Sequence, residues 1–233
     1  MILLTYFELC ITIVFLEDIP YKNAHEYISK IIGRAMLYDS ILKELHKQNI
    51  IKNFVVGLPY PVPTDTKIYL AKHAYVLNIR AFDRHFLEIL QGILSKENCG
   101  AKVLMSQIVQ CNYKPITTLT ALTPVVSVIK GKCWTIEDGF ELLQDRLHAN
   151  AERKAKIIFP DDINKSEQSF ITGIEMLNNK MNVIRYKEGV ILGTKIKLHV
   201  DSDEHSQRLA FVAMGAGLGE KGTICCGYCA SRF

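Results

Sequence analysis

The amino-acid sequence predicts an α+β protein made of two tandem domains, each with the element order β-α-β-β-α-β. Strand-like runs and amphipathic helical runs follow one another in that order along the first half of the chain, and a similar order returns in the second half. The 233 residues also suffice for two cores of roughly 100 residues each. With 48% hydrophobic and 22% charged residues, the composition is that of an ordinary globular protein.

The first domain is predicted to span residues 1–113. Residues 4–16 are rich in β-branched and aromatic side chains, which favours a long buried strand. This apolar stretch has no basic start, contains Glu8 and is too short to cross a bilayer. We therefore expect neither a signal peptide nor a membrane contact.

The other elements of the first domain follow in order. Apolar residues recur at helical spacing across 23–48, with a break expected near 38–40 and a last turn that ends at His46. Three prolines mark a loop between short strands. The predicted elements after the first helix are strands at 54–56, 68–70 and 74–81, a capped helix at 83–94 and a strand at 102–111.

The second domain is predicted to span residues 114–233. Its expected elements are a strand pair within 117–129, a helix at 135–154, strands at 170–176 and within 180–200, a helix at 204–214 and a closing strand at 223–230. Both domains then have the order of the ferredoxin-like (RRM-like) fold. The two halves show no close internal repeat, so the duplication rests on element order alone.

Charge and cysteine content narrow the class of protein. The net charge of +4 has the sign that suits a polyanionic partner, and basic residues are denser in the second half. The seven cysteines are odd in number and mostly embedded in apolar stretches, which predicts reduced, buried thiols in a cytoplasmic protein. Cys226 and Cys229 form C-x-x-C, but no second ligand pair accompanies them, so we expect core packing and no metal.

A glycine-rich stretch, MGAGLGEKGTICCGYC, lies near the end of the chain at residues 214–229. Gly217 to Gly222 match G-x-G-x-x-G, yet the stretch follows a predicted helix and precedes a strand, the reverse of a dinucleotide-binding loop. No cofactor is therefore expected. A helix C-cap with a turn would use only one or two of the five glycines in thirteen residues.

The segment from Gly217 to Gly227 resembles the C-terminal glycine-rich loop of the CRISPR repeat-processing endoribonucleases, the Cas-six family of the RAMP superfamily. LHKQNIIKNF at 45–54 is similar to the segment that carries the family's active-site histidine and lysine. TLTALTPVVSV at 118–128 and RAFD at 80–83 also match family segments, and the resemblance covers essentially the whole chain. It implies two ferredoxin-like domains and binding of CRISPR repeat RNA.

The resemblance further implies metal-independent cleavage of precursor RNA by its own 2′-hydroxyl, which gives 2′,3′-cyclic phosphate and 5′-hydroxyl ends. A histidine can act as general base or acid, and a lysine can stabilise the charge on the phosphorane. His46 and Lys52 match these roles, with His25 as the rival histidine. The position where some family members have a third catalytic residue, a tyrosine, corresponds to Gly33.

The glycine-rich stretch is expected to hold RNA, because glycines let a phosphate backbone approach the main chain closely. The expected RNA-binding residues in it are Gly215, Gly217, Gly219, Lys221 and Gly222. Further candidates, expected on a hairpin, are Arg185, Lys187, Lys195 and Lys197. Contacts of this kind position an RNA chain without reading its bases.

Two other functions remain open at this point. The chain is either the nuclease described above, a non-catalytic RNA-binding RAMP subunit of a CRISPR interference complex, or the processing domain of a larger fusion protein. Other Cas proteins and a second copy of the chain are the expected protein partners.

Overall fold

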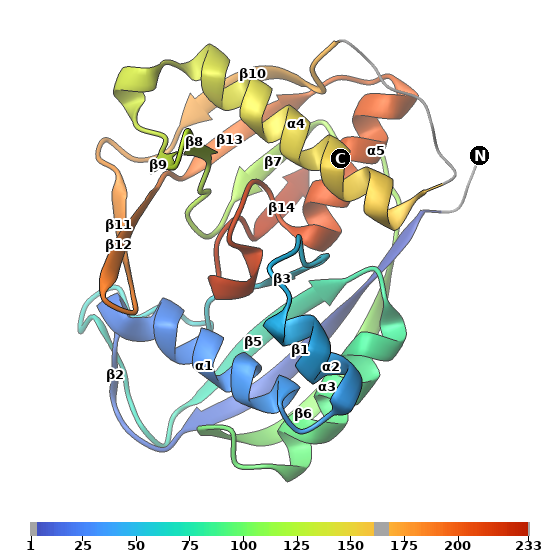
Figure 1. Ribbon diagram of the computed structural model, residues 1–233. Coiled ribbons are helices and arrows are strands. Elements are labelled where there is room, and N and C mark those ends of the chain that lie inside the picture. Colours follow the sequence, from blue (N-terminus) through green and yellow to red (C-terminus); the bar gives the residue numbers. More distant parts are fainter. Residues whose placement is uncertain (1–3, 161–167, 233) are drawn as a thin grey trace.

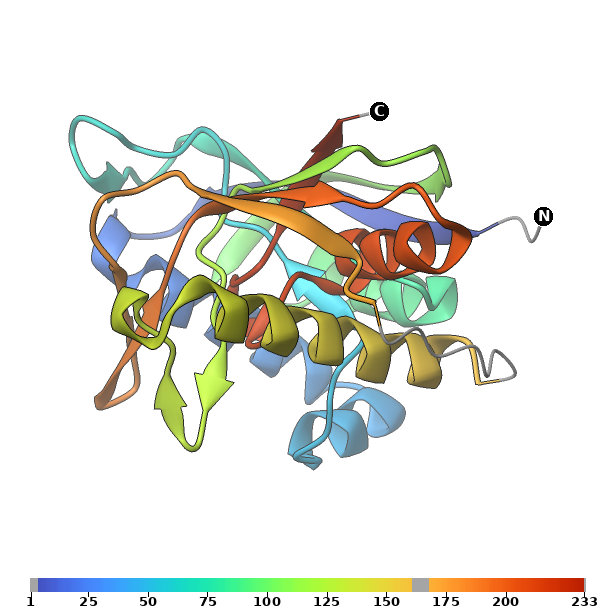
Figure 2. The ribbon, with the colours of Figure 1, turned by 90° about the horizontal axis from the view of Figure 1, so that it is seen from above.

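The computed structural model describes residues 4–160 and 168–232 and contains two four-stranded antiparallel sheets, each covered by helices (Figure 1). Figure 2 shows the strands of both sheets toward the top, with helix α4 (Phe140–Ile158) below them. The described residues thus form the α+β architecture that the sequence predicts.

The first sheet has the strand order β3-β5-β1-β6. Its strands are β1 (Thr5–Phe15), β3 (Phe54–Val56), β5 (Ala74–Ala81) and β6 (Ala101–Asn112). Leu9, Ile11 and Ile13 alternate along β1 and are buried beneath helices α1 (Ala24–Met36) and α3 (Arg84–Lys96). This alternation follows from the two-residue period of a strand, so the first core lies between the sheet and its two helices.

The second sheet has the strand order β10-β13-β7-β14, which is the same topology. Its strands are β7 (Thr118–Ala121), β10 (Ile171–Met176), β13 (Ile196–Val200) and β14 (Cys229–Arg232). Helices α4 and α5 (Glu204–Ala216) cover one face of it, and their buried residues form the second core with Leu119 and Leu198. Strand order and helix placement in both halves confirm the ferredoxin-like fold.

Smaller elements are added to these two units. The hairpins and short pairs are β2 (Ile19–Pro20) with β4 (Ile68–Tyr69), β8 (Val128–Ile129) with β9 (Lys132–Cys133), and β11 (Asn182–Tyr186) with β12 (Gly189–Gly193). The short helices are α2 (Ser40–Lys47), η1 (Tyr21–Asn23), η2 (Ile136–Asp138) and η3 (Gly222–Ile224). The break between α1 and α2 confirms the interruption predicted near 38–40.

Three predicted elements differ from the structure. The strand predicted at 68–70 pairs with β2 and stays outside the first sheet, because both edges of β5 are already paired, by β1 and β3. The helix predicted at 135–154 begins only at Phe140, because Gly139 takes φ +82° and ends the short helix η2. Residues 223–228 are not a strand, since Cys225 and Gly227 have φ of +61° and +70°, and β14 begins at Cys229.

A buried ionic cluster joins the two halves of the molecule. Arg80 of β5 is 8% exposed, forms an ion pair with Glu8 of β1 at 3.2 Å, and donates to the carbonyl of Cys229 at 2.7 Å. Its guanidinium also lies 4.1 Å from the centre of the Tyr228 ring, and the Tyr228 hydroxyl donates to Glu8. This cluster fixes the end of the glycine-rich stretch against the first sheet.

None of the helices in the described residues is long and apolar enough to span a membrane.

Candidate functional site

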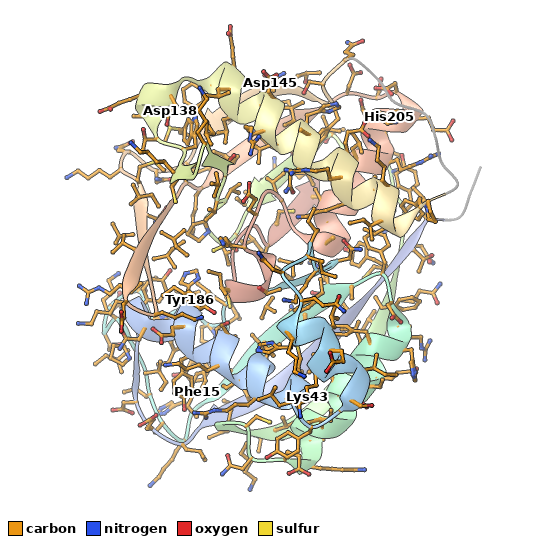
Figure 3. All side chains as sticks on the ribbon, in the orientation of Figure 1. Phe15, Lys43, Asp138, Asp145, Tyr186 and His205 are labelled. Carbon is orange, nitrogen blue, oxygen red and sulfur yellow. The ribbon has the colours of Figure 1, made fainter. Side chains whose placement is uncertain are left out.

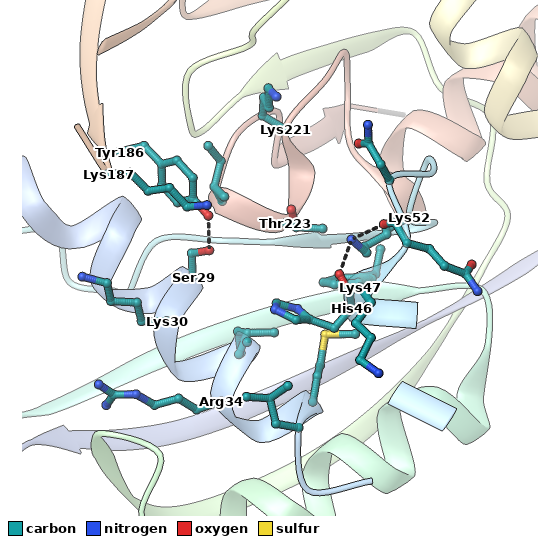
Figure 4. Close-up of a pocket in the computed structure, with 18 of the residues that line it drawn as sticks. Ser29, Lys30, Arg34, His46, Lys47, Lys52, Tyr186, Lys187, Lys221 and Thr223 are labelled. Carbon is teal, nitrogen blue, oxygen red and sulfur yellow. Dashed lines mark hydrogen bonds between the residues drawn. The ribbon is translucent and has the colours of Figure 1, made fainter. Parts of the chain in front are cut away.

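A pocket of about 610 Å³ lies where α1, α2, the β11–β12 hairpin and the glycine-rich stretch meet (Figure 4). Its walls therefore come from both halves of the chain. Figure 3 shows Tyr186, at the end of β11, beside α1.

His46 lies in this pocket, on the last turn of α2. The helix starts at a fixed place because the Asp39 side chain accepts hydrogen bonds from the backbone N–H groups of Ile41 and Leu42. The imidazole lies against Gly33 of α1. Within the described residues, neither ring nitrogen of His46 has a hydrogen-bond partner, so both are available to a ligand.

The surroundings of His46 favour its neutral form. Partial burial lowers the pKa of His46 below its usual value, and the charges of Lys52 and Lys187 lower it further. A neutral imidazole can accept a proton at neutral pH. The position therefore suits a general base.

Lys52 lies in the loop after α2 and lines the same pocket. Its ammonium donates hydrogen bonds to the carbonyls of His46 at 3.3 Å and Gln48 at 3.2 Å, and both are drawn in Figure 4. These carbonyls are at the end of α2, where a cation is favourable. Burial lowers the pKa of Lys52. The two bonds use two of the three N–H groups of an ammonium, which leaves one for a ligand.

The β11–β12 hairpin forms the opposite wall. The backbone N–H of Lys187 donates to Glu26 of α1 at 3.2 Å, and the hydroxyls of Tyr186 and Ser29 lie 3.5 Å apart. These contacts hold the hairpin turn against α1, which brings the Lys187 ammonium to the pocket. Sequence reasoning named Lys187 but missed Tyr186 and Ser29, for which it had no local signal.

The lining of the pocket is strongly basic. Among the described residues that line it, no Asp or Glu is present. The basic lining residues besides His46 are Lys30, Arg34, Lys47, Lys52, Lys187 and Lys221. Such a concentration of one charge in a concave site attracts a polyanion.

The glycine-rich stretch differs from the expectation in one respect. Gly215, Gly217 and Gly219 are buried, and the missing side chains make room for the protein itself. A Cβ at Gly215 would come within 2.5 Å of the Phe82 ring, and one at Gly219 within 2.6 Å of the Val126 carbonyl. The protein itself thus fills the space beside Gly215 and Gly217, whereas Gly219 and Gly222 line a second pocket, and RNA binding by these glycines stays a prediction. Lys221 is exposed and lines the pocket, as the sequence led us to expect.

Lys154 of α4 organises the stretch from behind, and sequence reasoning missed this role. Its side chain is buried, and its ammonium donates to the carbonyls of Ala216, Gly217 and Gly219 at 3.2, 2.6 and 2.7 Å. Burial lowers the pKa of Lys154 to about 7. The spacing of Leu143, Leu147, Asn150, Ala151 and Lys154 on the buried face of α4 was the available signal.

His25 has a structural role in the same stretch. It is 5% exposed, and its Nδ1–H donates to the Ile224 carbonyl at 2.9 Å, which fixes its tautomer. Burial lowers the pKa of His25. It is absent from the lining of the pocket, so the geometry favours His46 over this rival.

The four basic residues expected on one hairpin are split in the structure. Arg185 and Lys187 belong to the β11–β12 hairpin, whereas Lys195 precedes β13 and Lys197 lies within it. Lys197 forms an ion pair with Glu175 at 3.1 Å. The expectation of a shared hairpin is wrong, and only Lys187 of the four lines the pocket.

The prediction of buried thiols is confirmed for Cys99, Cys225, Cys226 and Cys229, whereas Cys10, Cys111 and Cys133 are half-buried. Cys226 and Cys229 are fully buried, and all seven thiols are free. Burial raises the pKa of Cys226 to about 12 and that of Cys229 to about 11, which keeps both thiols protonated. Across residues 4–160 and 168–232, no three His, Cys, Asp or Glu side chains gather so that they could hold a metal ion.

No protein-family model and no curated protein matches the sequence. Solved structures match it over nearly its whole length. One is described as CRISPR associated protein Cas6, with 18% identity, a TM-score of 0.73, and coverage of 98% of this chain and 100% of the other. The chain has the fold of the Cas6 proteins.

Two further structures agree with this fold. A RAMP protein described as binding different RNA substrates is 16% identical, with a TM-score of 0.75 and coverage of 97% and 100%. A Cas6-related protein from Pyrococcus furiosus is also 16% identical, with a TM-score of 0.72 and coverage of 97% and 98%. At these identities the matches show the fold alone.

Proposed function

We propose that the chain is an endoribonuclease that cleaves CRISPR repeat RNA without a metal ion. One observation carries the proposal: the His46 imidazole, with both ring nitrogens free and a lowered pKa, lies beside Lys52 in a basic pocket. Six lysine and arginine side chains, Lys52 included, line this pocket, and none of its described lining residues is Asp or Glu. The Cas6 fold and the RNA substrates named for the RAMP structure support it.

In the proposed reaction, a ring nitrogen of His46 takes the proton of the ribose 2′-hydroxyl. The 2′-oxygen then attacks the adjacent phosphorus, and the bond from phosphorus to the 5′-oxygen breaks. A water molecule protonates the departing 5′-oxygen, and the hydroxide so formed takes the proton from the His46 imidazolium, which restores the neutral base. The products are a 2′,3′-cyclic phosphate and a 5′-hydroxyl.

Lys52 stabilises the pentacoordinate phosphorane, which carries more negative charge than the phosphodiester. Its two hydrogen bonds to main-chain carbonyls hold the ammonium in place before the reaction. Fixed charges aimed at a developing charge lower a barrier most effectively, because they need no reorganisation. Lys187 and Lys221 add to the same field from the other walls.

The two domains divide the work in this proposal, with the boundary at residues 113 and 114. β6 ends at Asn112 and β7 begins at Thr118, which supports the division. The first domain supplies His46 and Lys52. The second supplies Lys187 and Lys221, so a functional site requires both.

The experiment incubates the protein with a CRISPR-repeat RNA in EDTA and analyses the RNA ends. We expect cleavage with a 2′,3′-cyclic phosphate, and loss of cleavage in His46→Ala with RNA binding retained. His73→Ala, which changes an exposed histidine outside the pocket, is the matched control. Full cleavage by His46→Ala would contradict the proposed base.

The alternative is a non-catalytic RNA-binding RAMP subunit. Gly33, at the position where some related enzymes have a tyrosine, is the observation that favours it. In that case the wild-type protein would bind the repeat RNA tightly and leave it intact under all these conditions.

A further inference from the structure

A second pocket, of about 470 Å³, lies on the other side of Lys221. It is enclosed by the loop after α2, the β8–β9 hairpin, helix α4 and the glycine-rich stretch, and Figure 1 shows these elements around the centre of the molecule. The residues that line both pockets are Asn49, Lys52, Lys221 and Thr223. The two pockets are therefore adjoining parts of one surface.

The second pocket is also basic. The cations that line it are Lys52, Lys130, Arg146, Arg153, Lys154 and Lys221. Glu220 is the single lining carboxylate among the described residues, and its Oε1 accepts a hydrogen bond from the Val128 N–H. The pocket thus holds a large excess of positive charge.

Two buried polar atoms in this lining lack a hydrogen-bond partner within the described residues. One is Oδ1 of Asn150, a residue that is only 4% exposed, and the other is Nε of Arg146. The Arg146 guanidinium is itself fixed, since its Nη2 donates to the Val128 carbonyl at 2.6 Å. Buried polar groups are almost always paired, and Nε of Arg146 is a donor, so an anion in the pocket would supply its missing partner.

These side chains suit an anion with several acceptor oxygens. A guanidinium matches the geometry of a phosphate group. Asn150 also lines the pocket, and its Nδ2 carries two N–H groups that can donate to a phosphate oxygen. Lys154 is not free for this role, because its three N–H groups go to main-chain carbonyls.

We propose that the second pocket binds a phosphodiester group of the RNA next to the one held at His46. This inference rests on the proposed function, because it takes the first pocket as the cleavage site. Lys221 then lies between two consecutive phosphates, and the RNA strand passes over the tip of the glycine-rich stretch toward α4. The second pocket fixes where along the strand the cut falls.

The test uses an RNA that cannot be cleaved because its scissile nucleotide is 2′-deoxy. Arg153→Gln removes an exposed cation of the pocket, and Lys156→Gln removes an exposed cation outside it on the same helix. We expect Arg153→Gln to weaken binding about fivefold to tenfold at low salt and to reduce the slope of log affinity against log salt by about 0.7. Lys156→Gln should match the wild type.

A length series locates the phosphate. The RNA is shortened by one nucleotide at a time from each end, and affinity is measured for the wild type and Arg153→Gln. The wild type should lose affinity in one step when the nucleotide in the second pocket is removed, and the variant should lack that step. Equal RNA affinities of Arg153→Gln and Lys156→Gln would overturn the inference. So would a length series in which the wild type and Arg153→Gln lose affinity at the same nucleotide.

The outcome is separable from that of the proposed function. If the wild type never cleaves repeat RNA but Arg153→Gln still loses the step, the nuclease proposal fails and the second pocket stands. If the wild type cleaves and Arg153→Gln binds normally, the nuclease proposal stands and the second pocket fails. Arg146→Gln, checked by circular dichroism for retained folding, serves as a second variant of the same pocket.

Discussion

The imidazole of His46 lies so close to Gly33 that a Cβ at residue 33 would come within 3.1 Å of its Cε1 atom. The absence of a side chain on α1 therefore sets where the ring can lie. We predict that Gly33→Ala shifts the imidazole by a few tenths of an ångström and lowers the single-turnover rate of RNA cleavage about tenfold, because catalysis is sensitive to small displacements. RNA binding should change little.

Gly92→Ala is the matched control for this substitution. Gly92 lies within α3, and a Cβ there would meet nothing within 4 Å. Alanine in a helix interior is favoured over glycine, so Gly92→Ala should raise the free energy of unfolding by about 0.5–1 kcal/mol and leave cleavage unchanged. Equal cleavage by both variants would show that the contact with Gly33 does not position His46.

The pH dependence of cleavage should respond to Lys187. A nearby cation disfavours the imidazolium, and Lys187 is one of the charges that lower the pKa of His46. In Lys187→Gln the pKa of His46 rises, so the acidic limb of the rate profile should move to higher pH. A profile measured under single-turnover conditions checks this.

Lys47→Gln is the control for the pH profile. Lys47 also lines the pocket, but its ammonium is paired with Glu44 at 2.7 Å. We expect its acidic limb to coincide with that of the wild type. An unshifted limb in Lys187→Gln would mean that a different group than His46 titrates in the rate.

Lys154 should be the most costly lysine to remove. Lys154→Met keeps the length of the side chain but leaves three carbonyls without their donor. Hydrogen bonds to charged groups are strong, so we expect a loss of about 3 kcal/mol in the free energy of unfolding. Urea denaturation of Lys154→Met and of Lys156→Met, an exposed neighbour, measures the difference. Equal stabilities would rule out the organising role of Lys154.

Acid should destabilise the fold through His25. Burial holds the pKa of His25 below its value of about 6.5 in an unfolded chain. As pH falls below that value, the unfolded chain binds the proton more readily than the folded one, so the free energy of unfolding falls, by at most about 1.4 kcal/mol per pH unit. His25→Gln keeps an N–H donor for the Ile224 carbonyl. In this variant the free energy of unfolding should fall less steeply as the pH is lowered, and urea denaturation at several pH values measures that slope. An unchanged slope would place the acid sensitivity elsewhere.

The regular elements were predictable from local patterns. The alternation along β1, the break between α1 and α2, and the Asp83 cap of α3 all follow from short-range physics, and the structure confirms them. Two of the three failures lie where the backbone turns left-handed, whereas the strand at 68–70 stays outside the first sheet because both edges of β5 are already paired. Lys221 and Cys225 have φ of +65° and +61°, and a run of strand-forming residues gives no local sign of such turns.

The site was predictable in part. The family resemblance pointed to two of the segments that carry His46, Lys52 and Lys221, and these three residues line one pocket. Their roles stay predictions. The role of Lys154 was missed because its charge predicts an exposed side chain. Its spacing from Leu143, Leu147 and Ala151 predicts the opposite, a place on the buried face of α4. Arg146 stood out only as one of the basic residues of the second half, and Asn150 was missed, because their positions depend on which elements pack beside α4 and a single sequence does not show that packing.

The hairpins β8–β9 and β11–β12 lie outside both four-stranded sheets, yet they carry Lys130 and Lys187 to the two pockets. Changes in the length of a hairpin turn therefore leave both sheets and the position of His46 intact, whereas loss of the charge at Lys187 also raises the pKa of His46. Under the proposed function, affinity for RNA can be varied at the turn that carries Lys130 without a change to the sheets that support His46 and Lys52.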